Sequence, residues 1–270
     1  MNNALKQYLN YPCTGPEISL HNHSCWSDGK DSTAEMCRAA RAAGVKVFGL
    51  SDHYVDHPEA CCMPVSWSMD IARLDEYVDE VVKLKKEVSD GQFTLFAGLE
   101  VDFFFDNIDE VLKKLSGYPL DYLIGSVHYV GKFPIDHSAD NWRELSPEEN
   151  DSVCRKYWEK VYAAAACGRF TFLGHLDLTK KFKMVPDRRR YLPDAVKVLD
   201  CAAANGTPIE LNTAGWFKPC EEAYPDLDIL REANRRKVPV VINADAHSAA
   251  HITRSFPEAR ALLREAGYPV

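Results

Sequence analysis

Short apolar runs that end in a polar residue alternate with helix-like segments along most of this chain. Seven such runs occur in 270 residues, and their ends lie 28 to 47 residues apart. That spacing leaves room for a helix after each strand, as in βα units. Alternating strands and helices favour a parallel sheet with the helices packed outside it. The runs span residues 17–23, 45–53, 93–100, 122–128, 170–175, 208–212 and 239–247.

The segments between the runs have the spacing of amphipathic helices. Apolar residues recur among charges in 70–88, for example at Leu74, Val78 and Val81. The segment 33–43 follows the capping residue Ser32 and precedes Gly44, a common helix stop. We expect further helices at 107–115, 147–167, 191–204, 226–237 and 257–266. Seven or eight βα units predict a closed barrel in one domain, residues 1–270, with an open doubly wound sheet as the alternative.

Composition limits the class of protein. The net charge is −8, from 32 basic and 40 acidic residues, whereas non-specific nucleic-acid binders carry a basic face. We therefore expect no nucleic-acid partner, and no apolar run approaches the ~20 residues of a membrane span. The first nine residues lack the apolar region of a secretion signal. Nine cysteines, including the adjacent Cys61 and Cys62, form no disulfide or zinc framework, which favours reduced thiols in the cytoplasm.

Histidines and carboxylates stand at six of the seven predicted strand ends. The carboxyl ends of barrel strands form one face with the loops that follow them, so these side chains should meet in one mouth. The candidates are His21, His23, His53, Glu100, His128, His175, Asp245 and His247. Such a cluster is costly to bury alone, whereas divalent cations stabilise it. The sequence therefore predicts a metal centre.

Strand geometry refines this prediction. Side chains at positions i and i+2 of a strand point the same way, so His21 and His23 can hold one ion together. Asp245 and His247 have the same spacing. Of the neighbours Asp52 and His53, only one can point inward, and we choose His53. Asp52 is then free to orient a ligand from behind.

A single histidine at a strand end is usually a hydrogen-bonded structural group, but eight candidates at matching positions favour metal binding. His57, His137 and His251 lie beyond the strand ends and are expected to be ordinary or substrate-facing. Asp28 follows His23 closely enough to fold back over the metals, although Ser27-Asp28-Gly29 also suits a simple turn.

These motifs, in this order, resemble the PHP (polymerase and histidinol phosphatase) superfamily over about residues 17–267. The resemblance implies a distorted (β/α)7 TIM-like barrel with two or three metal ions. It implies that His21, His23, Glu100 and Asp245 bind the first ion. Glu100 would bridge to a second ion on His128 and His175, and a third would bind the remaining ligands, Asp28, His53 and His247. Mixed nitrogen and oxygen ligands suit zinc, iron or manganese.

Within the superfamily the chain is most similar to monofunctional histidinol-phosphate phosphatases, through stretches such as 124–128, 174–182 and 209–215. Phe217 departs from the family pattern, which has an arginine there, and this leaves the phosphate substrate open. Lys218 beside it and Lys180 after His175 are the expected phosphate-binding residues, with Lys180 also neutralising charge during catalysis.

The expected chemistry is hydrolysis of a small phosphomonoester by metal-activated water, with Asp177 or a bound water as general acid. L-histidinol phosphate is the expected substrate. The alternatives are a phosphoesterase for a nucleotide or another small phosphate, an amidohydrolase-type barrel, and a catalytically silent binding module. Amidohydrolases usually carry a metal-bridging lysine at a later strand end, whereas here Glu100 occupies the third strand end. The complete ligand set argues against a silent module.

Overall fold

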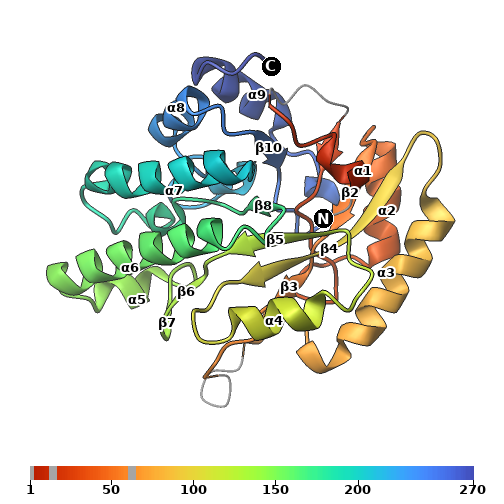
Figure 1. Ribbon diagram of the computed structural model, residues 1–270, viewed down its shortest axis with the longest axis horizontal. Helices are drawn as coiled ribbons and strands as arrows, with labels where there is room; N and C mark the ends of the chain where they lie inside the picture. The colour runs from red at the N-terminus through yellow and green to blue at the C-terminus, as the bar shows by residue number, and fades with distance from the viewer. Residues whose placement is uncertain (1–2, 12–16, 60–64) are drawn as a thin grey trace.

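Seven parallel strands form the centre of the molecule (Figure 1). The computed structural model describes residues 3–11, 17–59 and 65–270. In spatial order the strands are β1 (Ile18–Ser19), β2 (Val47–Leu50), β4 (Thr94–Asp102), β5 (Tyr122–Ser126), β8 (Phe172–Leu173), β9 (Ile209–Asn212) and β10 (Val240–Asn243). A short strand, β3 (His53–Tyr54), continues the chain after β2 and also pairs with β4.

The two ends of this sheet approach each other just beyond β1 and β10. Asn22 and Ala246 form a parallel bridge, in which the amide of His23 donates to the carbonyl of Ala246 at 2.9 Å. The amide of Ala246 donates back to the carbonyl of His21 at 3.2 Å. The sheet is therefore nearly closed, and the predicted seven-stranded barrel is confirmed over the open sheet.

Helices surround the strands (Figure 1). The longer ones are α2 (Thr33–Ala42), α3 (Leu74–Val88), α4 (Ile108–Leu115), α6 (Pro147–Ala166), α7 (Leu192–Asn205), α8 (Leu227–Arg235) and α9 (Phe256–Glu265). Each lies where the sequence predicts a helix. Ser32 and Glu35 cap α2 reciprocally, as Ser146 and Glu149 cap α6. The predicted start at residue 70 is early, because Asp70 caps a 3-10 turn that precedes α3.

Large side chains fill the barrel interior. Tyr122 is buried there, and its hydroxyl donates to the carbonyl of Leu20 at 2.6 Å. A Cβ on Gly98 would lie 2.3 Å from the Tyr122 ring, so glycine is required for this ring to fit. Leu5 in α1 (Asn3–Lys6) and Leu9 after it belong to the same interior cluster. The barrel is consequently a packed core with its chemistry confined to one end.

Several local features differ from the sequence-based expectation. β6 (Tyr129–Val130) and β7 (Phe133–Pro134) form an antiparallel hairpin after β5, and α5 (Ala139–Arg143) follows it. β10 ends at Asn243, and Asp245 has a left-handed backbone with φ of 49°. The i, i+2 strand argument therefore does not explain why Asp245 and His247 come together, because the backbone at Asp245 is not extended.

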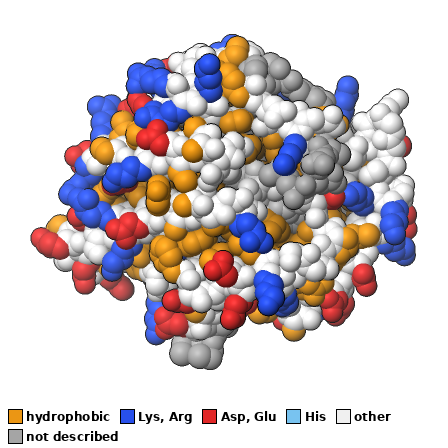
Figure 2. Space-filling view, viewed as in Figure 1, with side chains coloured by type: hydrophobic (Ala, Val, Ile, Leu, Met, Phe, Trp, Pro, Cys, Tyr) orange, Lys and Arg blue, Asp and Glu red, His pale blue; other side chains and the backbone are white. Residues whose placement is uncertain are grey.

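Surface and cysteine features bear on the class of protein. Basic and acidic side chains are mixed along the left of the face drawn in Figure 2. In the described segments, no helix combines the length and apolar character needed to cross a membrane. Six described cysteines are free thiols. Cys61 and Cys62 lie outside the described residues.

Candidate metal centre

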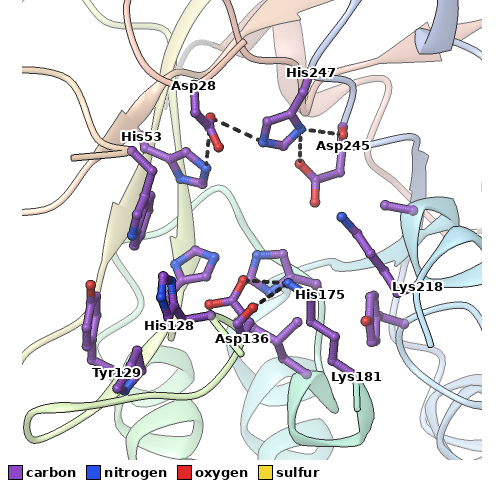
Figure 3. A pocket seen from close by; sticks show the side chains of 16 residues that line it. Asp28, His53, His128, Tyr129, Asp136, His175, Lys181, Lys218, Asp245 and His247 are labelled. Atoms are coloured by element: carbon purple, nitrogen blue, oxygen red, sulfur yellow. Dashed lines mark hydrogen bonds and ion pairs between the residues drawn. The ribbon is translucent and has the colours of Figure 1, made fainter. Parts of the chain in front are cut away.

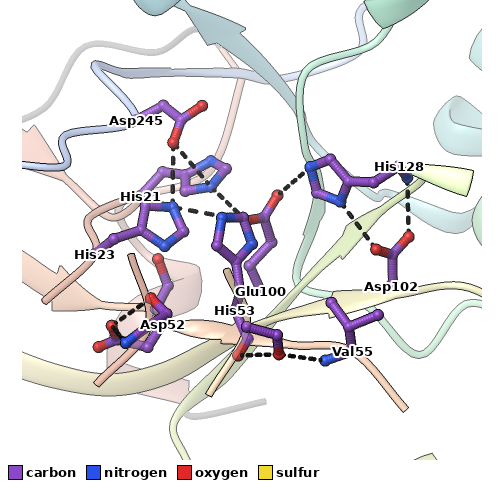
Figure 4. Close-up of polar contacts among 12 residues, drawn as sticks. His21, His23, Asp52, His53, Val55, Glu100, Asp102, His128 and Asp245 are labelled. Carbon is purple, nitrogen blue, oxygen red and sulfur yellow. Dashed lines mark hydrogen bonds and ion pairs between the residues drawn. The ribbon is translucent and has the colours of Figure 1, made fainter. Parts of the chain in front are cut away.

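The structure brings all nine predicted metal ligands together at the carboxyl ends of the strands (Figures 3 and 4). They come from six places in the chain, namely the segments that follow β1, β2, β5, β8 and β10, and β4 itself. Parallel strands bring these positions to the same rim of the barrel. The residues are His21, His23, Asp28, His53, Glu100, His128, His175, Asp245 and His247.

Glu100 lies at the centre of this group and is 1% exposed. Its Oε2 is 2.7 Å from Nδ1 of His53 and 3.1 Å from Nε2 of His21. Its Oε1 is 2.8 Å from Nε2 of His175 and 3.7 Å from Nε2 of His128. The two oxygens thus face different sets of imidazoles, an arrangement that fits the expected bridging role of Glu100.

Several buried polar atoms at the centre have no hydrogen-bond partner among the described residues. They include Nε2 of His21, both ring nitrogens of His23, Nδ1 of His53, Oε2 of Glu100 and Oδ1 of Asp245. Native proteins satisfy nearly all buried polar groups, so such a concentration indicates a missing partner. Imidazole nitrogens and carboxylate oxygens are ligands of zinc, iron and manganese. The residues present fit divalent metal ions.

Ligand atoms that lie within 4.8 Å of one another form four overlapping groups. They are His23, Asp28, His53, His247; His21, Glu100, His175; His21, His23, Asp245; and His53, Glu100, His128. The family resemblance implies a similar division, but it pairs His128 with His175, whereas here each belongs to a separate group with Glu100. Residues that belong to more than one group, such as His21 and Glu100, connect neighbouring candidate metal sites.

The charge balance of the centre shows in the pKa values of its histidines. Burial alone would lower the pKa of His21, but the carboxylates of Glu210, Glu100 and Asp245 hold it well above its usual range. Burial and the neighbouring imidazoles lower the pKa of His23 to about 3. Burial also opposes the charge on His128, yet Asp102 and Glu100 raise its pKa to about 10. Without metal, His21 and His128 would therefore hold protons that a cation must displace.

Comparisons with known proteins agree with this geometry. Residues 19–214 match the PHP domain family. The chain belongs to the PHP domain family. The protein named "Probable histidinol-phosphatase" of Deinococcus radiodurans is 34% identical over 248 residues, which is 92% of either chain. The histidinol-phosphatase of Bacillus subtilis is 26% identical over 88% of this chain and 95% of its own.

A solved structure supports the same PHP fold. It is histidinol phosphate phosphatase of Lactococcus lactis, complexed with zinc, L-histidinol and phosphate. It superposes with a TM-score of 0.74 at 21% identity and covers 94% of both chains. At this identity the comparison establishes the fold.

In this PHP domain a loop brings Asp28 beside His53 and His247, the residues with which it is expected to bind a third ion. Oδ1 of Asp28 lies 3.2 Å from Nε2 of His247 and 3.6 Å from Nε2 of His53. The Asp52 carboxylate anchors the start of that loop, because it accepts hydrogen bonds from the amides and hydroxyls of Ser24 and Ser27 at 2.7–3.1 Å. Asp52 was expected to orient a metal ligand directly. It instead holds the loop that carries Asp28.

Two carboxylates behind the ligands were not predicted. Oδ2 of Asp102 lies 3.0 Å from Nδ1 of His128, and Oε1 of Glu210 lies 2.7 Å from Nδ1 of His21. Carboxylates in this position fix the ring orientation and tautomer of a ligand histidine. The sequence carried a signal for both. Asp102 follows Glu100 by two residues and Glu210 precedes Asn212 by two, so strand alternation directs each pair to one side of the sheet.

Replacing Asp102 by Asn should weaken the centre without unfolding the barrel. The amide would no longer balance the charge on His128 or hold its ring as firmly. We expect about a 10–100-fold loss of metal affinity or activity. Metal titration monitored by fluorescence, together with kcat/KM, measures both. The control is Asp31→Asn, because Asp31 accepts a hydrogen bond from the amide of Ala249 and contacts no ligand histidine in this way. This change should leave metal affinity and kcat/KM unchanged. A full-affinity Asp102→Asn protein would contradict the assigned role.

Six of the nine candidate ligands line a cavity of about 240 Å³ (Figure 3), namely Asp28, His53, His128, His175, Asp245 and His247. This size suits a small metabolite. Lys181, Lys218 and Asp136 supply charged groups on its walls. Trp67 and Tyr129 form an aromatic wall, with ring planes 10° apart and centroids 6.1 Å apart. Of the histidines expected to be ordinary or substrate-facing, His137 lines this cavity, whereas His57 packs behind Tyr129.

Two predicted catalytic residues are not brought into the cavity. Lys180 is 1% exposed, and its Nζ lies 2.8 Å from Oδ2 of Asp177. Burial raises the pKa of Asp177 to about 6, against the opposing charge of Lys180. Neither residue lines the cavity, whereas the next lysine, Lys181, does. The predicted phosphate-binding residue Lys218 also lines it, and Phe217 beside it is 52% exposed.

Proposed function

We propose that this PHP domain is a metal-dependent phosphomonoesterase that hydrolyses L-histidinol phosphate to L-histidinol and phosphate. The observation that carries the proposal is the Glu100-centred ligand cluster opening into a small cavity with lysines on its wall. The names of the relatives from Deinococcus radiodurans and Bacillus subtilis support this substrate. The ligands in the Lactococcus lactis complex agree with it.

We infer that two or three zinc, iron or manganese ions bind the nine ligands. Bound divalent ions lower the pKa of water and neutralise charge on phosphoryl oxygens. Glu100 would share its two oxygens between positions, while Asp102 and Glu210 hold the rings of His128 and His21. The ligand residues then place the reactive centre at the floor of the cavity.

Lys218 is the best-placed cation for the phosphate. Its side chain points into the cavity (Figure 3), and no ion pair with it occurs among residues 3–11, 17–59 and 65–270. A lysine without a carboxylate partner is free to neutralise a phosphoryl oxygen. Lys181 is less free, because its Nζ lies 3.0 Å from Oδ2 of Asp136. We therefore assign phosphate contact first to Lys218, and not to the buried Lys180.

Asp136 and the aromatic wall suit the other end of the substrate. Asp136 lines the cavity, and although burial would raise its pKa, His128 and Lys181 lower it, so this carboxylate is charged at neutral pH. It can attract the amine of an amino alcohol. Trp67 lies edge-on to His53 with ring centroids 4.6 Å apart, which places an aromatic surface beside the metal ligands. A flat imidazole ring would pack on such a surface.

A related phosphoesterase activity on a nucleotide or another small phosphate is the second candidate, since Phe217 departs from the family pattern. A silent binding module from another class is the third. We further propose that the protein works in the cytoplasm, where free cysteines such as Cys25 stay reduced.

A substrate panel tests the proposal. Metal-loaded protein is assayed for phosphate release from L-histidinol phosphate and from nucleotide and sugar phosphates. We expect L-histidinol phosphate to exceed the others by about a hundredfold in kcat/KM, which corresponds to roughly 2.7 kcal/mol of transition-state discrimination. If another phosphate is preferred, the metal chemistry stands and the substrate is wrong. If none is hydrolysed, the binding-module alternative is favoured.

A further inference from the structure

Arg254 contacts the segment that carries the cavity-lining Lys218, and it has no assigned role. It follows the 3-10 turn Ala249–His251 in the connection from β10 to α9. Its carbonyl accepts a hydrogen bond from the Thr213 hydroxyl at 2.7 Å, which ties it to the segment that carries Lys218. Its guanidinium lies over the Phe217 ring, with Cζ 3.8 Å from the ring centroid. Arg254 is therefore held against the segment that carries Lys218.

The guanidinium lacks the partner that a partly buried arginine normally has. Nε of Arg254 is buried and donates no hydrogen bond to any described residue. Among the residues that the structure describes, no carboxylate lies within ion-pair distance of the Arg254 guanidinium. Burial lowers the pKa of Arg254, while the Asp245 carboxylate, a cavity-lining group, acts in the opposite direction. A cation left without an anion at this place indicates that an anion is supplied from outside.

Contact with an aromatic ring does not use up the donors of a guanidinium. Its N–H groups lie in the plane of the group and form a fork that matches phosphate oxygens, whereas the ring interacts with its face. Phe217 can thus position Arg254 while leaving N–H groups for another ligand. Lys218, the residue after Phe217, already faces the cavity.

We propose that Arg254 binds a phosphoryl oxygen of the substrate, as a second cation beside Lys218, with Phe217 as its positioning residue. This inference rests on the proposed function, since it assigns the anion as the phosphate of that substrate. The two cations would come from different connections of the barrel, one after β9 and one after β10.

Binding of inorganic phosphate to the metal-loaded protein tests this assignment without requiring turnover. Arg254→Gln should weaken phosphate binding by about tenfold or more, because a charge-assisted hydrogen bond is lost. KM for the phosphomonoester should rise with it. Arg254→Lys should fall between wild type and Arg254→Gln, since it keeps the charge and loses the fork. Arg189→Gln, at a side chain that is 88% exposed, is the matched control and should change neither value.

The thermal midpoint and metal content identify a merely structural effect. The Thr213 hydrogen bond goes to the Arg254 backbone, so substitution of the side chain should leave both at the wild-type value. Wild-type phosphate affinity in Arg254→Gln would overturn the inference, as would a loss of affinity explained by lost metal. If phosphate binding depends on Arg254 but no ester is hydrolysed, the proposed function fails, and Arg254 is a ligand of phosphate but not of a substrate.

Discussion

Replacing Glu100 by Gln should abolish most activity and remove metal while leaving the barrel folded. The neutral amide cannot offer both oxygens to the imidazoles of His21, His53 and His175, so neighbouring metal positions lose a shared ligand. We expect kcat/KM to fall by roughly 10³-fold or more, beyond the ~10–100-fold typical of residues behind the ligands. Activity and metal content per chain are the measurements.

A buried carboxylate elsewhere provides the control for Glu100→Gln. Asp121 accepts from Lys85 Nζ at 2.6 Å and from the amide of Ala97 at 2.8 Å. It directly precedes β5, at the amino ends of the strands, whereas the metal ligands lie at the carboxyl ends. Asp121→Asn should lower the thermal midpoint yet keep full metal content. If Glu100→Gln keeps full metal content and turnover, Glu100 is not the bridging ligand and the account of the centre is wrong.

Removing metal with a chelator should abolish turnover and destabilise the protein. The unpartnered atoms of His21, His23 and Glu100 would then remain buried without compensation. Ions present at a thousandfold excess over their Kd stabilise by about 4 kcal/mol, which corresponds to roughly 8–16 °C in Tm for a domain of this size. Differential scanning calorimetry with and without chelator measures the shift.

The same experiment has a defined pH dependence. Asp102 and Glu100 raise the pKa of His128 to about 10 against the effect of burial, so a metal-free protein is protonated there at neutral pH. Metal must displace that proton, and its stabilising effect should shrink as the pH falls. The Glu100→Gln protein should show a much smaller chelator effect. An equal shift in both proteins would mean that metal acts elsewhere.

The fold was predictable because its units repeat a strong local pattern. Apolar runs alternate with amphipathic segments, and caps such as Ser32 mark the helix starts. The β6–β7 hairpin was missed because each strand has only two residues, too few for a period to show. The early end of β10 was missed because the left-handed backbone of Asp245 leaves no trace in an otherwise strand-like run.

The clustering of the candidate ligands was predictable because all of them except Asp28 lie at, or within a few residues of, the end of a strand. Residues that act through long-range contacts were harder to predict. Lys180 and Lys181 are adjacent and equally basic, and only the packing around the 3-10 turn Leu178–Lys180 decides which faces the cavity. Arg254 lies 37 residues after Phe217 (254 − 217), so the sequence gives no sign that they touch.

Titration of zinc or manganese into metal-free protein, with turnover of L-histidinol phosphate as the readout, tests the central claim most directly. We predict no hydrolysis without metal and a rise to a plateau when two or three ions are bound per chain. The ligand groups around Glu100 would then be the catalytic centre. Turnover that persists in the metal-free protein, or full metal occupancy without any hydrolysis, would contradict a metal-dependent phosphatase.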